Sequence, residues 1–302
     1  MTVERVHLRE VAPRDGLQNE AVTVPAATKV AFVERLAAAG LPYVEATSFV
    51  SPKWIPQLAD GAEVARRLRK RPGTKYAALV PNRKGYEAFR AAGTLDVAAV
   101  FLSATETHNR KNVNKSIDET LPVLREVAEA ARRDGFSTRG YVSVVFGCPY
   151  EGKTPVENVL RVARELLAME CDEISLGDTV GYANPKQVKE VLARVFELAP
   201  PERFALHFHD TRGTALANAL AALEAGASKF DGSVGGLGGC PYAPGAAGNV
   251  ATEELVYLFT EMGIETGVNL DALIEAASFI SGEVKRDLPS RYLRARLSEA
   301  KR

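Results

Sequence analysis

The sequence predicts an α/β fold: a single (β/α)₈ TIM barrel with a C-terminal helical extension. Three observations lead to this prediction. Eight short β-rich runs recur along the 302 residues, helical patterns separate them, and no linker-like change in composition divides the chain. Eight strands, each followed by a helix, are the number that closes such a barrel.

The predicted elements follow one another along the whole chain. The strands are predicted at residues 5–11, 43–48, 75–80, 96–103, 139–146, 172–176, 203–208 and 229–234. The clearest helical patterns cover residues 27–40, 61–70, 118–135, 156–170 and 217–227. Several of them end at or near a Gly, as helices often do. A further helical pattern at 269–286 follows the eight units, so we expect one domain over residues 1–302 with the extension beginning at about 263.

A doubly wound open sheet is the alternative fold. That fold usually carries G-x-G-x-x-G at a junction between a strand and a helix. The nearest match here begins at Gly236 and Gly238, and it has Pro241 where the third glycine would fall. The barrel is therefore the prediction, and a dinucleotide-dependent oxidoreductase is not expected.

Composition excludes several classes of partner. Lys and Arg number 38, as do Asp and Glu, so the net charge is zero and gives no reason to expect binding to nucleic acid or to a membrane surface. No apolar run is long enough for a transmembrane helix, and the N-terminus resembles neither a signal peptide nor a transit peptide. Three cysteines suit a reducing compartment, so a cytoplasmic location is expected.

Residues that can carry chemistry cluster where the predicted strands end. In a barrel of this kind, the active site lies at the carboxyl ends of the strands. The residues at these ends are Arg14 and Asp15 after the first strand, Glu45 on the second, Asp178 after the sixth, His207 and His209 on the seventh, and Cys240 and Asn249 after the eighth.

Four of these residues are expected to form a metal site. His207 and His209 are two residues apart, so on a strand they face the same side. Strands seven, eight and one are neighbours in a closed barrel, which brings Asn249 and Asp15 to the same place. A set of imidazole, carboxylate and amide ligands without thiolate favours Mg²⁺ or Mn²⁺, and Zn²⁺ or Co²⁺ is also compatible.

The stretch 235–249 contains six glycines and two prolines around Cys240. A surface loop of no particular function is one interpretation of this composition. The alternative is a mobile flap that carries Cys240 over the mouth of the barrel, beside the expected metal site. We favour the flap, and expect Cys148 and Cys171 to be ordinary buried thiols.

Six segments together resemble hydroxymethylglutaryl-CoA lyases, a family of the DRE-TIM metallolyase superfamily. The resemblance extends from about residue 5 to about residue 280, in order and with similar spacing. The segments are VAPRDGLQNE, VEATSFVSPKWIPQLAD, GYVSVVFGCPYEG, EISLGDTVG, HFHDTRGTALAN and GGLGGCPYAPGAAGNVATEELVY.

The resemblance implies cleavage of 3-hydroxy-3-methylglutaryl-CoA, an acyl-CoA, to acetyl-CoA and acetoacetate, as in leucine degradation. It implies a homodimer and a divalent cation held by the four residues named above. It also implies that Arg14 contacts substrate and that Cys240 is catalytic. Glu45 and Asp178 match further acidic residues of the family. Whether His207 or Asp178 accepts the hydroxyl proton of the substrate stays open.

Three alternatives to this function remain at the level of sequence. A sibling lyase would cleave a longer substrate, such as 3-hydroxy-3-isohexenylglutaryl-CoA. A Claisen-type synthase of the same superfamily would form the bond instead, but it usually carries a long C-terminal regulatory region. A non-catalytic metal-binding protein would be expected to have lost at least one of the site residues, and all of them are present.

Overall fold

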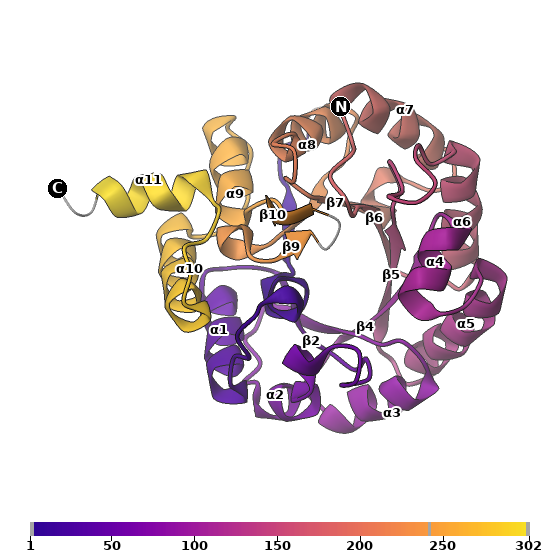
Figure 1. Ribbon diagram of the computed structural model, residues 1–302, viewed down its shortest axis with the longest axis horizontal. Coiled ribbons are helices and arrows are strands. Elements are labelled where there is room, and N and C mark those ends of the chain that lie inside the picture. Colours follow the sequence, from indigo (N-terminus) through magenta and orange to yellow (C-terminus); the bar gives the residue numbers. More distant parts are fainter. Residues whose placement is uncertain (1–2, 241–242, 300–302) are drawn as a thin grey trace.

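Eight parallel strands close into a barrel in the computed structural model, which describes residues 3–240 and 243–299. Figure 1 looks down this barrel and shows the helices as a ring around it. The strands are β1 (His7–Glu10), β2 (Tyr43–Ser48), β3 (Lys75–Leu79), β4 (Val97–Ser103), β5 (Ser137–Ser143), β6 (Glu173–Asp178), β7 (Phe204–Phe208) and β8 (Lys229–Gly232).

The barrel is closed by pairing between β1 and β8. His7 pairs with Lys229 and Glu10 pairs with Gly232, while the other edge of β1 pairs with β2. The predicted TIM barrel is therefore confirmed, and the doubly wound sheet is wrong because that sheet would leave two strands with unpaired edges.

Helices cover the outside of the barrel. They are α1 (Ala26–Ala38), α2 (Gly61–Arg67), α3 (Arg83–Ala92), α4 (Glu106–Val113), α5 (Ile117–Arg133), α6 (Val156–Ala168), α7 (Pro185–Val195), α8 (Ala215–Glu224), α9 (Thr252–Glu261), α10 (Leu270–Val284) and α11 (Arg291–Glu299). The last two lie outside the ring, beside α1 and α9 (Figure 1). Within the described ranges, every helix is too short or too polar to cross a bilayer.

Local sequence explains where the helices begin and end. The Ser116 side chain accepts from the backbone N–H of Glu119, and Glu119 in turn accepts from the backbone N–H of Ser116. This capping box satisfies two N–H groups at the start of α5. Gly93, at a φ of 74°, adopts the left-handed conformation that ends α3.

Two features differ from the expected elements. β6 continues to Asp178, so this residue is the last of its strand instead of following it. The glycine-rich stretch forms a short antiparallel pair, β9 (Gly239–Cys240) with β10 (Ala243–Ala247), which periodicity did not predict because each strand is short and rich in glycine and alanine.

Candidate metal centre and active site

A tight turn after β1 positions the first two site residues. Residues Ala12–Gly16 form a single π-helical turn in which the carbonyl of Val11 accepts from the backbone N–H groups of Asp15 and Gly16. Such wide turns are rare in proteins as a whole, and those that occur often lie at functional sites. The turn places Asp15 where its carboxylate faces the end of β7.

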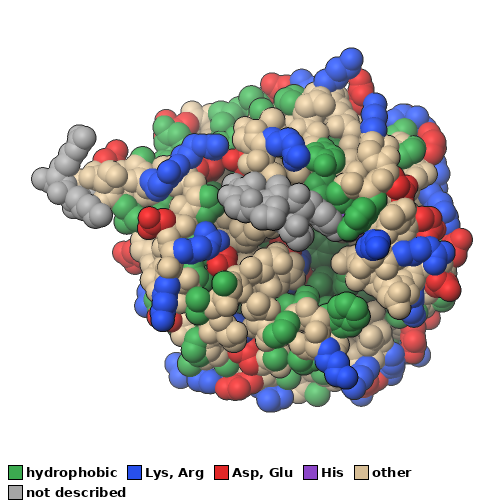
Figure 2. All heavy atoms as spheres, in the orientation of Figure 1, with side chains coloured by type: hydrophobic (Ala, Val, Ile, Leu, Met, Phe, Trp, Pro, Cys, Tyr) green, Lys and Arg blue, Asp and Glu red, His purple; other side chains and the backbone are tan. Residues whose placement is uncertain are grey.

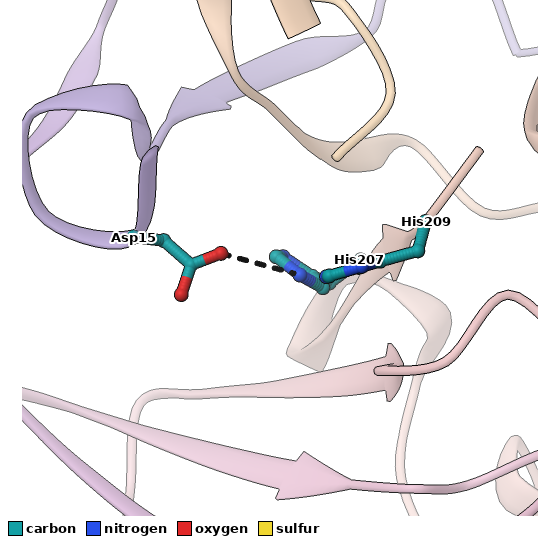
Figure 3. A group of neighbouring side chains, drawn as sticks. All are labelled: Asp15, His207 and His209. Atoms are coloured by element: carbon teal, nitrogen blue, oxygen red, sulfur yellow. Dashed lines mark ion pairs between the residues drawn. The ribbon is translucent and has the colours of Figure 1, made fainter. Parts of the chain in front are cut away.

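Asp15, His207 and His209 form one cluster whose possible ligand atoms lie within 4.8 Å of one another. Figure 3 shows both imidazoles pointing from the end of β7 toward the carboxylate of Asp15. Nε2 of His207 is 4.0 Å from Oδ2 of Asp15. The two imidazoles can converge because His207 and His209 are two residues apart in extended chain and so face the same side.

Asn249 completes the cluster from the segment after β10. Its Nδ2 donates to Oδ2 of Asp15 over 2.8 Å, and its backbone bridges to that of His209. Oδ1 of Asn249 and Nδ1 of His209 are buried and have no hydrogen-bond partner among the described residues. Two unsatisfied acceptor atoms beside a carboxylate fit a divalent cation, because its coordination would remove the cost of burying them.

The electrostatics of the cluster keep these groups in the form that binds metal. Burial alone would raise the pKa of Asp15, but the Arg14 guanidinium, together with the two imidazoles, lowers it to about 2. Burial, assisted by His207, lowers the pKa of His209 to about 3. Near neutral pH the carboxylate is thus ionised and the His209 imidazole is neutral, as metal ligands must be.

Arg14 is buried beside this cluster and is held by two carboxylates. Its Nε and Nη2 lie 2.9 Å and 2.8 Å from Oε2 of Glu45, and its Nη1 donates to Oδ1 of Asp15 over 2.5 Å. Glu45 is fully buried on β2, and its Oε1 has no partner among the described residues. The planar guanidinium is therefore fixed in orientation before any ligand binds.

Asp178 is the last residue of β6, which pairs directly with β7, and it lies opposite Phe208. Its two oxygens accept from the backbone N–H groups of Tyr182 and Ala183, over 2.8 Å and 3.1 Å. Burial raises the pKa of this carboxyl to about 6, although those hydrogen bonds oppose the shift. A carboxylate with a pKa near the working pH suits proton transfer.

The structure describes the backbone of Cys240 and not its side chain. Its backbone belongs to β9, and Gly248, which follows β10, accepts from the backbone N–H of Asp210 beside His209. The side chain of Cys240 lies outside the described atoms, so its catalytic role stays a prediction. Cys148 and Cys171 are buried free thiols, as expected.

The family model described as HMGL-like matches residues 5–280. The mitochondrial hydroxymethylglutaryl-CoA lyase of Bos taurus is 52% identical over 97% of this chain and 90% of its own. The chain belongs to the hydroxymethylglutaryl-CoA lyase family.

Solved structures of hydroxymethylglutaryl-CoA lyases agree with this assignment. The Bacillus subtilis enzyme superposes with a TM-score of 0.96 at 50% identity, covering 98% of this chain and 99% of its own. An Acinetobacter baumannii lyase, solved in complex with coenzyme A and 3-methylmalate, gives a TM-score of 0.92 at 40% identity over 98% and 97% of the two chains. These relatives are lyases, which favours the lyase over the synthase alternative.

As in a lyase that must admit a large thioester, this face of the molecule is hollowed. Figure 2 shows a depression near the barrel axis, with hydrophobic side chains around it and Lys and Arg side chains farther out. A hollow of this composition suits a ligand that has both apolar and anionic parts.

Several polar residues inside the barrel were not predicted from the sequence. Four of them are buried and hydrogen-bonded below the metal cluster: Arg139 and Tyr141 on β5, Ser175 on β6 and Asp231 on β8. Arg139 and Tyr141 are two residues apart on a predicted strand, so their shared inward face was a usable signal.

Proposed function

We propose that this protein is a hydroxymethylglutaryl-CoA lyase that cleaves 3-hydroxy-3-methylglutaryl-CoA to acetyl-CoA and acetoacetate. The observation that carries the proposal is the meeting of Asp15, His207, His209 and Asn249 beside a fixed Arg14, in a chain about half identical to curated lyases along nearly its full length. An acyl-CoA substrate is supported by the coenzyme A complex of the A. baumannii relative.

Asp15, His207, His209 and Asn249 are proposed to hold the cation, with Mg²⁺ or Mn²⁺ favoured by the absence of thiolate. A bound divalent cation would lower the pKa of the substrate's 3-hydroxyl group and fix its orientation. These residues fit a divalent cation because Oδ1 of Asn249 and Nδ1 of His209 are buried without a hydrogen-bond partner among the described residues.

Arg14 is proposed to stabilise the enolate oxygen of the thioester as the carbon–carbon bond breaks. Its guanidinium is permanently charged, and Glu45 and Asp15 hold it so that little reorganisation is needed in the transition state. Glu45 therefore acts through Arg14 and need not touch the substrate.

Asp178 is proposed as the base that removes the hydroxyl proton. His207 is less suited to this step because its Nδ1 is engaged by Asp231 and its Nε2 faces Asp15. The pKa of Asp178, about 6, leaves it mostly ionised near neutral pH and able to accept a proton. Cys240 is proposed to protonate the acetyl-CoA carbanion, as the family resemblance implies.

A direct assay tests the function. Metal-free protein is given Mg²⁺ or Mn²⁺ and 3-hydroxy-3-methylglutaryl-CoA, and acetyl-CoA and acetoacetate are followed together. Metal-dependent formation of equal amounts of the two products is the expected result. Cleavage only of a longer 3-hydroxyglutaryl-CoA would move the specificity to the sibling lyase, and no cleavage of either substrate would overturn the proposal.

A homodimer and a cytoplasmic location complete the proposal, on the strength of the family resemblance and the free thiols Cys148 and Cys171. Sedimentation equilibrium of the purified chain tests the dimer. A mass near 32.5 kDa, that of one chain, would contradict it.

A further inference from the structure

A buried arginine lies at the centre of the barrel, below the metal cluster. Arg139 on β5 is only 1% exposed, and its guanidinium lies over the rings of Tyr43 and Tyr141. Branched aliphatic side chains usually fill the interior of such a barrel. Burying a charge there costs free energy that an apolar side chain would not cost, so the position calls for an explanation beyond packing.

One side of Arg139 is connected to the metal cluster through Asp231. Nη2 of Arg139 donates to Oδ1 of Asp231 over 2.5 Å, and the hydroxyl of Ser175 donates to Oδ2 over 3.0 Å. The same Oδ2 lies 3.2 Å from Nδ1 of His207. Because Asp231 is surrounded by donors, it offers His207 an acceptor, which places the imidazole proton on Nδ1 and leaves the lone pair of Nε2 toward Asp15.

The other side of Arg139 is connected to Arg14. Nη1 of Arg139 donates to the hydroxyl of Tyr141 over 2.8 Å, so that hydroxyl must donate elsewhere. It donates to Oε2 of Glu45 over 3.0 Å. This oxygen also accepts from Arg14, so the position of Arg14 depends on a chain of hydrogen bonds that begins at Arg139.

We propose that Arg139 is a positioning residue that aligns both halves of the site: Asp231 selects the tautomer of His207 that binds metal, and Tyr141 with Glu45 orients Arg14. Arg139 does not touch the substrate or the cation in this arrangement. The tie between the two halves explains why a guanidinium is needed, since only a fork of several N–H donors can reach Asp231 and Tyr141 together.

The metal half is tested with Asp231→Asn. The asparagine oxygen should face Arg139, so its NH₂ group faces His207 and turns Nδ1 into an acceptor, which moves the proton to Nε2. Mn²⁺ affinity, measured by the electron paramagnetic resonance signal of free Mn²⁺, should fall about 10- to 100-fold. Wild-type affinity in the folded variant would overturn the role of Asp231.

The Arg14 half is tested with Tyr141→Phe, which removes only the hydroxyl. We expect kcat to fall about tenfold or more while Mn²⁺ affinity stays within twofold of wild type. Unchanged kcat would overturn the role of Tyr141. This measurement rests on the proposed function, whereas the Mn²⁺ titration does not, so an inactive wild type would leave the tautomer test intact.

Arg139→Lys tests the common origin of the two effects, because lysine keeps the charge but lacks the fork. Both Mn²⁺ affinity and kcat should fall in this variant. Lys29→Gln is the control, since Lys29 on α1 forms a buried ion pair with Asp60 and contacts neither half nor Arg139. Circular dichroism establishes that each variant is folded. If Arg139→Lys behaves like wild type, or if Lys29→Gln loses as much as it does, the proposal is wrong.

Discussion

At the scale of single residues, the site depends on one carboxylate with several neighbours. Asp15 accepts from Arg14 through one oxygen and from Asn249 through the other, and it faces two imidazoles. The same carboxylate thus serves the metal cluster and fixes the guanidinium beside it. Because Asp15 contacts both the imidazoles and the Arg14 guanidinium, the two residues are needed side by side, and they are adjacent in the sequence.

Arg14→Gln should lower kcat by about 10²–10³, because one preorganised donor to the developing enolate oxygen is lost. Glutamine retains a polar side chain, so the barrel should stay folded. The measurement is steady-state cleavage of 3-hydroxy-3-methylglutaryl-CoA, with Arg90→Gln as a control at an exposed arginine of α3 that pairs with Glu87 and Asp134. Near-normal turnover of folded Arg14→Gln would remove the residue from the mechanism.

Residue-level prediction from sequence succeeded where barrel topology limits the geometry. The meeting of His207 and His209 with Asp15 could be predicted, because strand neighbours and inward faces follow from the order of the strands. The roles of Arg139 and Asp231 could not, since a charged residue on a strand usually faces water and nothing in the local sequence identifies its partner.

At the scale of elements, Glu10 joins β1 to the segment after β8 and to α9. Its Oε1 accepts from the backbone N–H groups of Ala12 and Val234, and its Oε2 accepts from the hydroxyl of Thr252. It therefore holds together the turn that carries Asp15 and the start of the glycine-rich stretch. Glu10 is completely buried, and this burial raises its pKa to about 8.

Glu10→Gln should reduce the pH dependence of stability. The folded protein retains the Glu10 proton up to a pKa of about 8, whereas the unfolded chain releases it near 4.5, so the stability this group contributes is complete below pH 4.5 and is lost as the pH rises through 8. The glutamine oxygen still accepts from the backbone N–H groups of Ala12 and Val234, and its NH₂ group donates to the Thr252 hydroxyl instead of accepting from it. Glutamine cannot ionise.

Urea unfolding between pH 5.5 and 7.5 measures this effect. The free energy of unfolding of wild type, relative to Glu10→Gln, should fall with rising pH by up to about 1.4 kcal/mol per unit. Glu129→Gln, at an exposed position, is the control and should follow wild type. Parallel curves for wild type and Glu10→Gln would contradict the prediction.

Element-level prediction from sequence located all eight barrel strands, because each is a short β-rich run between helical patterns. It missed β9 and β10, where glycine and alanine give no alternation of apolar and polar side chains. It also ended the sixth strand at residue 176, whereas the structure continues this strand to Asp178.

At the scale of the whole molecule, metal binding should be coupled to folding, because the proposed ligands come together only in the closed barrel. At a free Mn²⁺ concentration 100 times the dissociation constant, the folded state gains about 2.7 kcal/mol. We therefore expect Mn²⁺ to raise the melting temperature of wild type by several degrees, and to leave that of Asp15→Asn nearly unchanged.

Differential scanning calorimetry with and without Mn²⁺ checks this expectation. Asp118→Asn is the matched control, because it removes an exposed carboxylate from α5 and should preserve the increase. An equal increase in Asp15→Asn would show that the cation binds elsewhere.

The pairing of β1 with β8 has a consequence for biosynthesis. Asp15 and Asn249 are 234 residues apart, so a nascent chain exposes Arg14, Asp15 and both histidines before Asn249, the last of the proposed ligands, leaves the ribosome. Such a chain has neither a closed barrel nor a complete coordination set, and it must remain unligated until the eighth unit is made. Metal acquisition therefore marks completed chains, and truncated translation products that stop before residue 249 are left without this source of stability and open to proteolysis.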